Sequence, residues 1–391
     1  MPAMPQTFDI CIRGAGVVGR TLALLLARER LRVALVASPP PAGALADVRA
    51  YALNSASRTL LESLRSWPDD VHATPVQRMQ VWGDQGGEVC FDAASQGVDA
   101  LAWIVDVPAL EARLTEAVRF QPQVEVVAAP VPAALTVICE GRASATRSEL
   151  GIEFDATAYP QHAIATRLEC QHPHGQTARQ WFGSDDSILA FLPLGGAEGQ
   201  SVAVVWSVPA PQVPGLMALD AAEFALRLEA ASQGALGSLH LTSGRATWPL
   251  QLAQARQWCG TFPSQNPAQG TAPPPARTPA SSWVLAGDAA HNVHPLAGQG
   301  LNLGLGDVQA LAEVLRAREA WRSVGDLRLL RRYERQRKAG ILPMGLTTDG
   351  LQQLFGRSEA PLQLLRNWGM SGFERSGPLK DWIARRAMAS N

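Results

Sequence analysis

The start of the chain alternates between short apolar runs and a helix-forming segment. Residues 8–12 (FDICI) form an apolar run that is typical of a buried strand, and a glycine cluster follows at residues 14–19. Residues 21–30 (TLALLLARER) are rich in good helix formers, and residues 33–37 (VALVA) are again typical of a strand. These segments together predict a strand–turn–helix–strand unit of about 30 residues.

The middle of the chain has a different pattern, in which short apolar runs are separated by turn residues. Gly, Asp, Pro and Ser stand between these runs, and two stretches with helical spacing interrupt them at residues 108–118 and 220–231. The pattern predicts a mixed or antiparallel sheet that is inserted into the α/β part. Its strands are expected at residues 76–83, 88–93, 101–107, 162–170, 177–182, 187–194 and 201–208.

The last third of the chain returns to the strand–helix pattern. Residues 261–281 hold six prolines together with Gly, Ser, Gln and Thr, which predicts a loop. Residues 283–287 (WVLAG) are typical of a strand, and a long helical pattern runs from about 300 to 318. The tail, residues 326–388, has a helical pattern with many arginines.

Composition and charge narrow the class of protein. The chain has 391 residues, with 34 Lys and Arg against 35 Asp and Glu, and this balance argues against a nucleic-acid partner. Prolines interrupt the uncharged stretches at residues 199–219 and 257–276, so no membrane-spanning helix is expected. The N-terminus lacks the basic region of a signal peptide. The five cysteines form no CxxC pair, which favours reduced, mostly buried thiols and no metal site.

The glycine cluster has the spacing of a phosphate-binding turn. Gly14 allows a tight turn after the first strand, Gly16 allows a pyrophosphate to approach the backbone beside Ala15, and Gly19 allows close packing of helix on strand. The helix N-terminus would then offer free N–H groups to the phosphates. An acidic residue is usual at the end of the second strand, where it binds a ribose hydroxyl. This chain has Ala37 there, which predicts a weaker or differently made adenosine site.

A second candidate site follows the strand that ends at Gly287. Asp288 places a carboxylate at the carboxyl end of that strand, where α/β sheets bind their ligands. Gly298 and Gly300 allow a flat or anionic ligand to approach the backbone closely, and a helix begins beside them.

The stretch of residues 287–304, GDAAHNVHPLAGQGLNLG, resembles the flavin-dependent aromatic hydroxylases that share the para-hydroxybenzoate hydroxylase fold. Within them, the chain is most similar to the UbiH-like group of ubiquinone biosynthesis, over about residues 8–385. The resemblance implies that Asp288 binds the ribityl chain of FAD and that Pro295 lies against the flavin. It also implies that a third segment binds the flavin ring and phosphates through its backbone: Gly298, Gln299, Gly300, Leu301 and Asn302.

Other parts of the chain match the family less closely. The segment from Asp47 to Leu53 resembles one whose arginine contacts FAD, so Arg49 is a candidate FAD ligand, and an ordinary ion pair is the alternative. The family's second fingerprint has the form Ala-Asp-Gly-x-x-Ser-x-x-Arg. Here Cys139 replaces the alanine and Glu140 the aspartate, and Val107 stands where a polar residue is often found before a helix. Glu140 and Val107, like Ala37, would weaken the binding of FAD.

The expected fold class is α/β: a Rossmann-like FAD-binding domain with an inserted mixed β-sheet substrate domain and a C-terminal helical tail. The FAD-binding domain is expected in three pieces, residues 1–75, 108–155 and 259–325. The substrate sheet is expected at residues 76–107 and 156–258, and the helical region at residues 326–391.

The resemblance implies an FAD-dependent monooxygenase that uses O2 to hydroxylate the ring of a polyprenylated phenol in ubiquinone biosynthesis. The reductant is expected to be NAD(P)H or an electron-transfer protein, because the fold has no separate nicotinamide domain. Two alternatives stay open: a hydroxylase of a small soluble aromatic, and a non-catalytic scaffold in a ubiquinone-biosynthesis complex. A hydrophobic pocket would favour the prenylated substrate, and a pocket with free arginines would favour a small acid.

No catalytic base follows from the sequence. His291 and His294 have His-x-x-His spacing, but hydrogen bonds to loop backbone are the favoured interpretation over a metal site. The C-terminal region 351–388 mixes apolar and arginine residues, which is compatible with a membrane-surface element, although a helix packed on the domain is favoured. The expected location is the cytoplasm, with peripheral contact at the inner membrane or a lipid-carrying partner as the route to a prenylated substrate.

Overall fold

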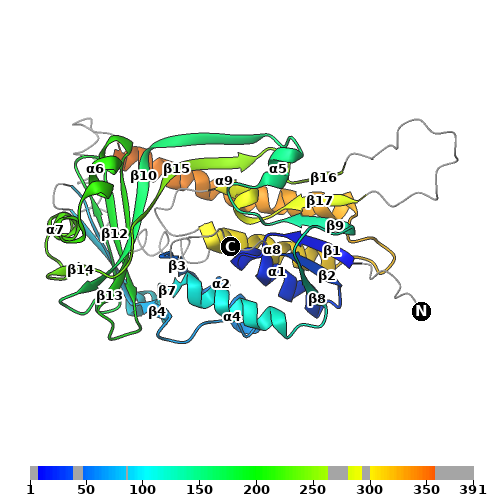
Figure 1. The fold of residues 1–391 in the computed structure, drawn as a ribbon, viewed down its shortest axis with the longest axis horizontal. Helices are drawn as coiled ribbons and strands as arrows, with labels where there is room; N and C mark the ends of the chain where they lie inside the picture. Colours follow the sequence, from blue (N-terminus) through cyan, green and yellow to red (C-terminus); the bar gives the residue numbers. More distant parts are fainter. Residues whose placement is uncertain (1–7, 38–46, 85–86, 263–280, 293–299, 357–391) are drawn as a thin grey trace.

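A computed structural model describes residues 8–37, 47–84, 87–262, 281–292 and 300–356, with side chains up to residue 341. The described chain contains a six-stranded sheet, a nine-stranded sheet and a small three-stranded sheet. Figure 1 shows the nine-stranded sheet at the left of the view and the six-stranded sheet with its helices at the right. The long strands β10 and β15 run between these two bodies.

The six-stranded sheet has the arrangement of a dinucleotide-binding domain, with the first strand near its centre. Its order is β16-β17-β9-β1-β2-β8, and all neighbours pair in parallel except β16 and β17. Parallel strands are usually buried by helices, and this explains their continuous apolar runs. The strands are β1 (Phe8–Arg13), β2 (Val33–Val36), β8 (Val124–Val127), β9 (Ala133–Ile138), β16 (Cys259–Thr261) and β17 (Ser282–Leu285).

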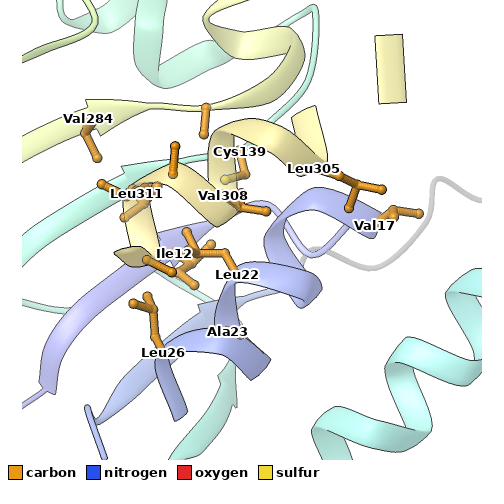
Figure 2. Packing of buried hydrophobic residues seen from close by; sticks show 14 of the residues in the cluster. Ile12, Val17, Leu22, Ala23, Leu26, Cys139, Val284, Leu305, Val308 and Leu311 are labelled. Atoms are coloured by element: carbon orange, nitrogen blue, oxygen red, sulfur yellow. The ribbon is translucent and has the colours of Figure 1, made fainter. Parts of the chain in front are cut away.

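Helices α1 (Val17–Arg28) and α8 (Gly300–Arg316) pack together and build the largest core. Their apolar faces meet over the first strand, where Ile12, Leu22 and Val308 are fully buried, as Figure 2 shows from close by. Helix α9 (Leu327–Gly356) packs against α8 and β16. The remaining helices here are α2 (Ser55–Ser63), α4 (Val107–Arg119) and the short α5 (Ala145–Glu149).

The nine-stranded sheet is mostly antiparallel and carries a second core on its outer face. Along the path β18-β15-β10-β13-β12-β11-β5-β6, only β11 and β5 pair in parallel, and β14 pairs with β10. Helices α6 (Val213–Ala218) and α7 (Ala221–Ala231) follow η1 (Ala210–Gln212), and their apolar residues cover the outer face. The strands are β5 (Arg78–Trp82), β6 (Glu88–Asp92), β10 (Phe154–Cys170), β11 (Thr177–Phe182), β12 (Ile188–Leu194), β13 (Ser201–Pro209), β14 (Leu239–Leu241), β15 (Ala246–Ala255) and β18 (His291–Asn292).

The three-stranded sheet lies against the inner face of the large sheet. It consists of β3 (Ala50–Leu53), β7 (Ala102–Asp106) and β4 (Ala73–Val76), in the order β3-β7-β4. Ile104 and Val76 pack there against Ala203 and Leu194 of the large sheet. A short helix, α3 (Ala93–Gln96), follows β6.

The predicted α/β class with an inserted mixed sheet is confirmed, but several element bounds were wrong. The strand expected at residues 76–83 is two strands in different sheets, β4 and β5, which separate at Gln77. Strand β10 begins at Phe154, well before the expected residue 162. Strand β15 was missed because Pro249 interrupts its pattern; the structure accommodates this proline opposite an irregularity in β10 between Ala158 and His162.

The tail is helical as far as Gly356, and residues 357–391 lie outside the described residues, as do residues 263–280 of the predicted loop. In the part of the chain that the structure describes, no helix has the length and apolarity needed to span a bilayer.

Candidate functional site

The turn after β1 has the geometry of a phosphate-binding turn. Gly14 has a φ of +106°, and a Cβ added to it would lie 2.4 Å from the carbonyl oxygen of Cys139. A Cβ on Gly19 would lie 1.9 Å from the carbonyl oxygen of Gly14, so the helix can approach the turn only without a side chain there. Around Gly16, by contrast, a Cβ would meet no atom within 4 Å.

The N-terminus of α1 is open beside this turn. Gly16 is the N-cap residue and is exposed, and Ala15 is half-buried. Among the described residues, no side chain caps the helix. The first N–H groups of a helix have no partner within the helix, and they carry a partial positive charge. An anion is therefore favoured at this point of the structure.

Asp288 lies in a second turn, at the carboxyl end of β17. Gly287 has a φ of +64° and begins a 3₁₀ turn, η2 (Gly287–Ala289), that presents the Asp288 side chain. This side chain is accessible to solvent and accepts no hydrogen bond from the described residues. Protein atoms nevertheless surround it: desolvation raises the pKa of its carboxyl, against the lowering effect of His291 and Arg142. Accessible and yet desolvated, Asp288 has the surroundings of a group in a cleft.

Helices α1 and α8 bring the two turns together. A Cβ on Gly304 of α8 would lie 2.9 Å from a methyl group of Val18 and 3.4 Å from the Cα of Gly287. A Cβ on Gly287 would also meet Val18, at 3.3 Å. The glycine cluster near residue 14 and the Asp288 turn are thus neighbours in space, although they lie far apart in the sequence.

The Asp288 turn also connects the two large sheets. After the turn, β18 pairs with β15, so that Asn292 faces Ala253. The Nδ2 group of Asn292 donates to the backbone carbonyl of Asp288 at 2.9 Å. The turn is therefore held between the six-stranded and the nine-stranded sheet.

A buried carboxylate, that of Asp307, is hydrogen-bonded to the Asp288 turn. Asp307 of α8 is fully buried, and its Oδ2 accepts from the backbone N–H of Gly287 at 2.8 Å. The same oxygen lies 2.7 Å from Nε2 of His291, and Nε of Arg337 donates to Oδ1 at 2.7 Å. Burial raises the pKa of Asp307, but the charges of His291 and Arg337 hold it below its ordinary value. The expected backbone partner for His291 was therefore wrong, because its partner is a carboxylate.

Arg49 lies on the strand segment that leads into β3. Its Nε and Nη2 donate to both oxygens of Asp47, at 2.6 to 3.0 Å, and this pairing raises the pKa of the guanidinium. The Arg49 side chain keeps 47% of its surface exposed. Burial raises the pKa of the neighbouring Tyr51, and the charge of Asp288 adds to this effect. Arg49, Tyr51 and Asp288 therefore lie near enough for their charges to affect one another, and Arg49 forms an ion pair with Asp47.

Asn302, near the start of α8, connects this helix to β3 through its side chain. Its Nδ2 donates to the carbonyl of Ala52 at 2.8 Å, and its Oδ1 accepts from the N–H of Asn54 at 3.0 Å and from the hydroxyl of Ser57 at 2.7 Å. Gly300 and Leu301, the residues before it, are half-buried. The predicted residues Pro295, Gly298 and Gln299, and also His294, lie outside the described residues.

The three departures that are expected to weaken FAD binding, at Glu140, Val107 and Ala37, have identifiable surroundings. Glu140 accepts from the hydroxyls of Ser144 and Thr146, at 2.7 and 2.6 Å, and forms an ion pair with Arg13. The backbone N–H of Val107 donates to the carbonyl of Arg49 at 3.3 Å. Ala37 is half-buried and its N–H donates to Val127. Each of these three residues thus forms at least one hydrogen bond with other residues of the fold.

The residues present fit an FAD molecule. The open N-terminus of α1 suits the pyrophosphate, and the carboxylate of Asp288, which has no hydrogen-bond partner among the described residues, suits a sugar or ribityl hydroxyl. A metal centre has no comparable support, because the described residues contain no group of three His, Cys, Asp or Glu side chains placed to hold an ion.

Comparisons with known proteins agree with this geometry. Residues 281–341 match the model of the FAD binding domain family, and these include the Asp288 turn and Asp307. The chain is 31% identical to the 3-demethoxyubiquinol 3-hydroxylase of Escherichia coli, over 98% of this chain and 99% of that protein. The chain belongs to the UbiH-like family of FAD-dependent monooxygenases.

Further matches support this family membership. The ubiquinone hydroxylase UbiL of Rhodospirillum rubrum is 30% identical, over 98% of this chain and 90% of that protein. Among solved structures, the p-nitrophenol 4-monooxygenase PnpA of Pseudomonas putida has the same fold, with a TM-score of 0.71 and 18% identity over 98% of this chain and 97% of that one. This UbiH-like protein is an FAD-dependent aromatic monooxygenase, with a phenolic substrate and O2 as its reactants.

Sequence reasoning missed the residues that support the site from outside it. Asp307, Arg337 and Arg13 were not predicted, and neither were Arg167 and Asp106, which pair at 2.8 and 3.0 Å between β10 and the N-cap position of α4. One signal was present: Asp307 stands among glycine and apolar residues, in the run LGLGDV at residues 303–308, and a carboxylate in such a run is rarely buried without partners.

Proposed function

We propose that this UbiH-like protein hydroxylates the aromatic ring of a polyprenylated phenol, as an enzyme of ubiquinone biosynthesis. The names of the E. coli and R. rubrum relatives support this substrate class. The observation that carries the proposal is a row of small, mainly apolar side chains on the inner face of the nine-stranded sheet, two of which stay partly accessible.

Small side chains form the centre of this inner face. The pairing register places five residues side by side across five strands, and four of them are alanine or valine: Ala246, Ala165, Val205, Ala190 and Gln180. Ala190 and Val205 stay partly accessible although their strands are paired on both sides. Space is therefore left above them, and an apolar group can fill it.

Two polar side chains, Gln180 and Ser207, stand on this same face. Gln180 keeps 8% of its surface exposed and Ser207 keeps 4%, and among the described residues neither side chain has a hydrogen-bond partner. Buried polar groups are normally hydrogen-bonded, so both side chains are free to bind an oxygen substituent of a phenol ring.

The arginine on the inner face is not available for a small acid. Arg167 stands one row further along β10, and both of its terminal nitrogens bond the carboxylate of Asp106. A small aromatic acid would require an uncommitted cation in the pocket. The surroundings therefore favour a phenol with an apolar tail over a soluble acid.

The residues of the chain would bind, orient and shield, whereas FAD supplies the redox and oxygen chemistry when it is bound. Gly14, Gly16 and Asp288 would hold the cofactor, and Arg49 would contribute a positive charge. Gln180 and Ser207 would orient the ring, and the small apolar residues around them would exclude water from it. We further propose NAD(P)H or an electron-transfer protein as the reductant, and a membrane surface or a complex of the pathway as the source of the substrate.

The test is an O2-dependent turnover assay with the full chain, FAD and a reductant. The substrate is a prenylated phenol in phospholipid vesicles, and the same ring without its tail and a soluble aromatic acid are compared with it. We expect a product that has gained one oxygen atom, by mass spectrometry, from the prenylated phenol alone. Preference for the soluble acid would overturn the substrate class, and a chain that takes up no FAD would establish a scaffold.

A pair of tryptophan variants tests where the substrate binds: one fills the space above Ala190, and the other is its matched control. Ala190→Trp should abolish turnover of the prenylated phenol, because the indole occupies the space above the sheet, while FAD stays bound. Leu226→Trp, on the outward face of α7 where Leu226 is 63% exposed, should leave turnover unchanged. Equal turnover in both variants would contradict the location of the substrate site.

A further inference from the structure

Asp307 contacts residues on both sides of Asp288 and also α9. Its Oδ2 receives the N–H of Gly287, where the turn begins, and faces the ring of His291, where the turn ends in β18. Its Oδ1 receives Nε of Arg337 on α9. One carboxylate thus fixes Asp288 from the residues on either side of it.

Arg337 in turn is bound tightly between two helices. Its Nη2 donates to the carbonyl of Leu303 at 3.1 Å, and a Cβ on Gly306 would lie 2.9 Å from the same guanidinium nitrogen. Arg337 is 6% exposed and Asp307 is fully buried. A charge that is so deeply buried is tolerated only with its partner, so loss of Arg337 would force Asp307 to move or to take up a proton.

His291 also has a fixed orientation. Its ring stacks on the fully buried indole of Trp258, with centroids 5.2 Å apart and planes 23° from parallel. The ring can therefore not follow Asp307 if the carboxylate shifts, and the hydrogen bond between them would break.

We propose that Asp307 is a positioning residue for the FAD-binding turn, and that Arg337 makes the position of α9 a determinant of FAD affinity. The inference rests on the proposed FAD contact of Asp288. The backbone at Gly287 is in the left-handed region, and the hydrogen bond to Asp307 holds it there. A displaced Asp307 releases Gly287, and the carboxylate of Asp288 then no longer points into the site.

The experiment measures FAD affinity of the full chain after the flavin has been removed, by titration with FAD and flavin fluorescence. We expect Asp307→Asn and Arg337→Met to weaken FAD binding about tenfold or more, because each breaks a buried charge-assisted hydrogen bond. The double variant should be no weaker than Asp307→Asn, since both changes act through the same carboxylate. Arg337→Lys should recover part of the affinity.

Glu334→Gln is the matched control. It removes a charge from α9 next to these residues, where Glu334 accepts from the N–H of Trp258 and from Lys338, but it leaves Asp307 in place. We expect its FAD affinity to stay within about twofold of the unchanged chain. Urea unfolding of each flavin-free variant separates positioning from stability: a merely structural role lowers stability and leaves the affinity of the folded fraction unchanged.

Two results would overturn the proposal, and Asp288→Ala tells them apart. If Asp288→Ala loses FAD whereas Asp307→Asn and Arg337→Met keep it, Asp307 does not position the turn. If Asp288→Ala itself retains FAD, the proposed contact at this turn is wrong, and the inference fails with it. Should Asp307→Asn not fold, the comparison of Arg337→Met, Arg337→Lys and Glu334→Gln decides alone.

Discussion

Arg13 and Glu140 form an ion pair, with Nε and Oε1 3.1 Å apart, at the carboxyl ends of the neighbouring parallel strands β1 and β9. Both side chains are largely buried, with 22% and 19% of their surfaces exposed. Glu140 also accepts from Ser144 and Thr146 at the start of α5. Glu140 has one methylene more than the aspartate of the family pattern. Its carboxylate contacts both Arg13 at the end of β1 and the first residues of α5.

Glu140→Gln should lower the free energy of unfolding by about 1–3 kcal/mol, because it leaves Arg13 without its partner and weakens three hydrogen bonds. Glu140→Asp keeps the charge but shortens the reach, so its loss should be smaller. Urea unfolding at pH 7 measures both variants. A loss in Glu140→Asp that equals or exceeds that of Glu140→Gln would show that reach, and not charge, dominates at this position.

The contribution of Glu140 should depend on pH. Burial alone would raise the pKa of Glu140, but hydrogen bonds from Thr146 and Ser144 and the charge of Arg13 bring it below the ordinary value of 4.5. A carboxyl whose pKa is lowered in the folded state stabilises the fold at pH above 4.5, and this stabilisation is lost as the pH falls below that value. The difference in unfolding free energy between the unchanged chain and Glu140→Gln should thus be constant from pH 7 to about 5.5 and shrink towards pH 4. A constant difference over this whole range would contradict the ion pair.

Two glycines of the first turn should respond differently to the same change. Gly16→Ala should leave stability unchanged, because a Cβ there meets no atom within 4 Å, yet it should weaken FAD binding by blocking the close approach of the pyrophosphate. Gly19→Ala should lower both the stability and the FAD affinity, because its Cβ would lie 1.9 Å from the carbonyl oxygen of Gly14. The free energy of unfolding should fall by about 1–3 kcal/mol. Urea unfolding and FAD titration of the two variants test this. Unaltered FAD affinity in Gly16→Ala would place the phosphates elsewhere.

The parts of the site that the sequence predicted are those determined by local geometry. The spacing of Gly14, Gly16 and Gly19 after an apolar run determines a turn between a strand and a helix, whatever the rest of the chain does. The position of Asp288 after the WVLAG strand similarly determines that it lies at a strand's carboxyl end. Both expectations needed only the residues immediately around them, and the structure confirms both placements.

The contacts that support the site could not be predicted because the two partners of each contact are remote in the sequence. Asp307 lies 20 residues from Gly287 and 30 from Arg337, and Asn302 lies 250 residues from Ala52. Such pairs follow from the packing of α8 on β3 and α9, which no local pattern encodes. The change of sheet at Gln77 was missed for a related reason: residues 76–83 have the local pattern of one strand, and such a pattern does not indicate where the chain passes from one sheet to another.

Arg167 and Asp106 connect the nine-stranded sheet to the strand that carries Arg49. Besides the two bonds to Asp106, Arg167 donates to the backbone carbonyls of Val48 at 3.3 Å and Arg49 at 3.4 Å. A hydrogen bond from Arg167 to Asp106 raises the pKa of the guanidinium against the effect of burial, so Arg167 stays charged at neutral pH. The two side chains are 22% and 17% exposed, which places the pair between a surface and a buried ion pair.

Arg167→Met should therefore lower the unfolding free energy by about 1–3 kcal/mol and weaken FAD binding severalfold, because the segment that presents Arg49 loses its anchor. The matched control is Arg256→Met, which removes an exposed arginine that pairs with Asp155 and Glu153 at the surface and should have no measurable effect on either quantity. Urea unfolding and FAD titration measure both variants. Arg167→Met could lose stability and yet bind FAD as tightly as the unchanged chain. In that case the contacts of Arg167 stabilise the fold only, and Arg49 does not need them to contact the cofactor.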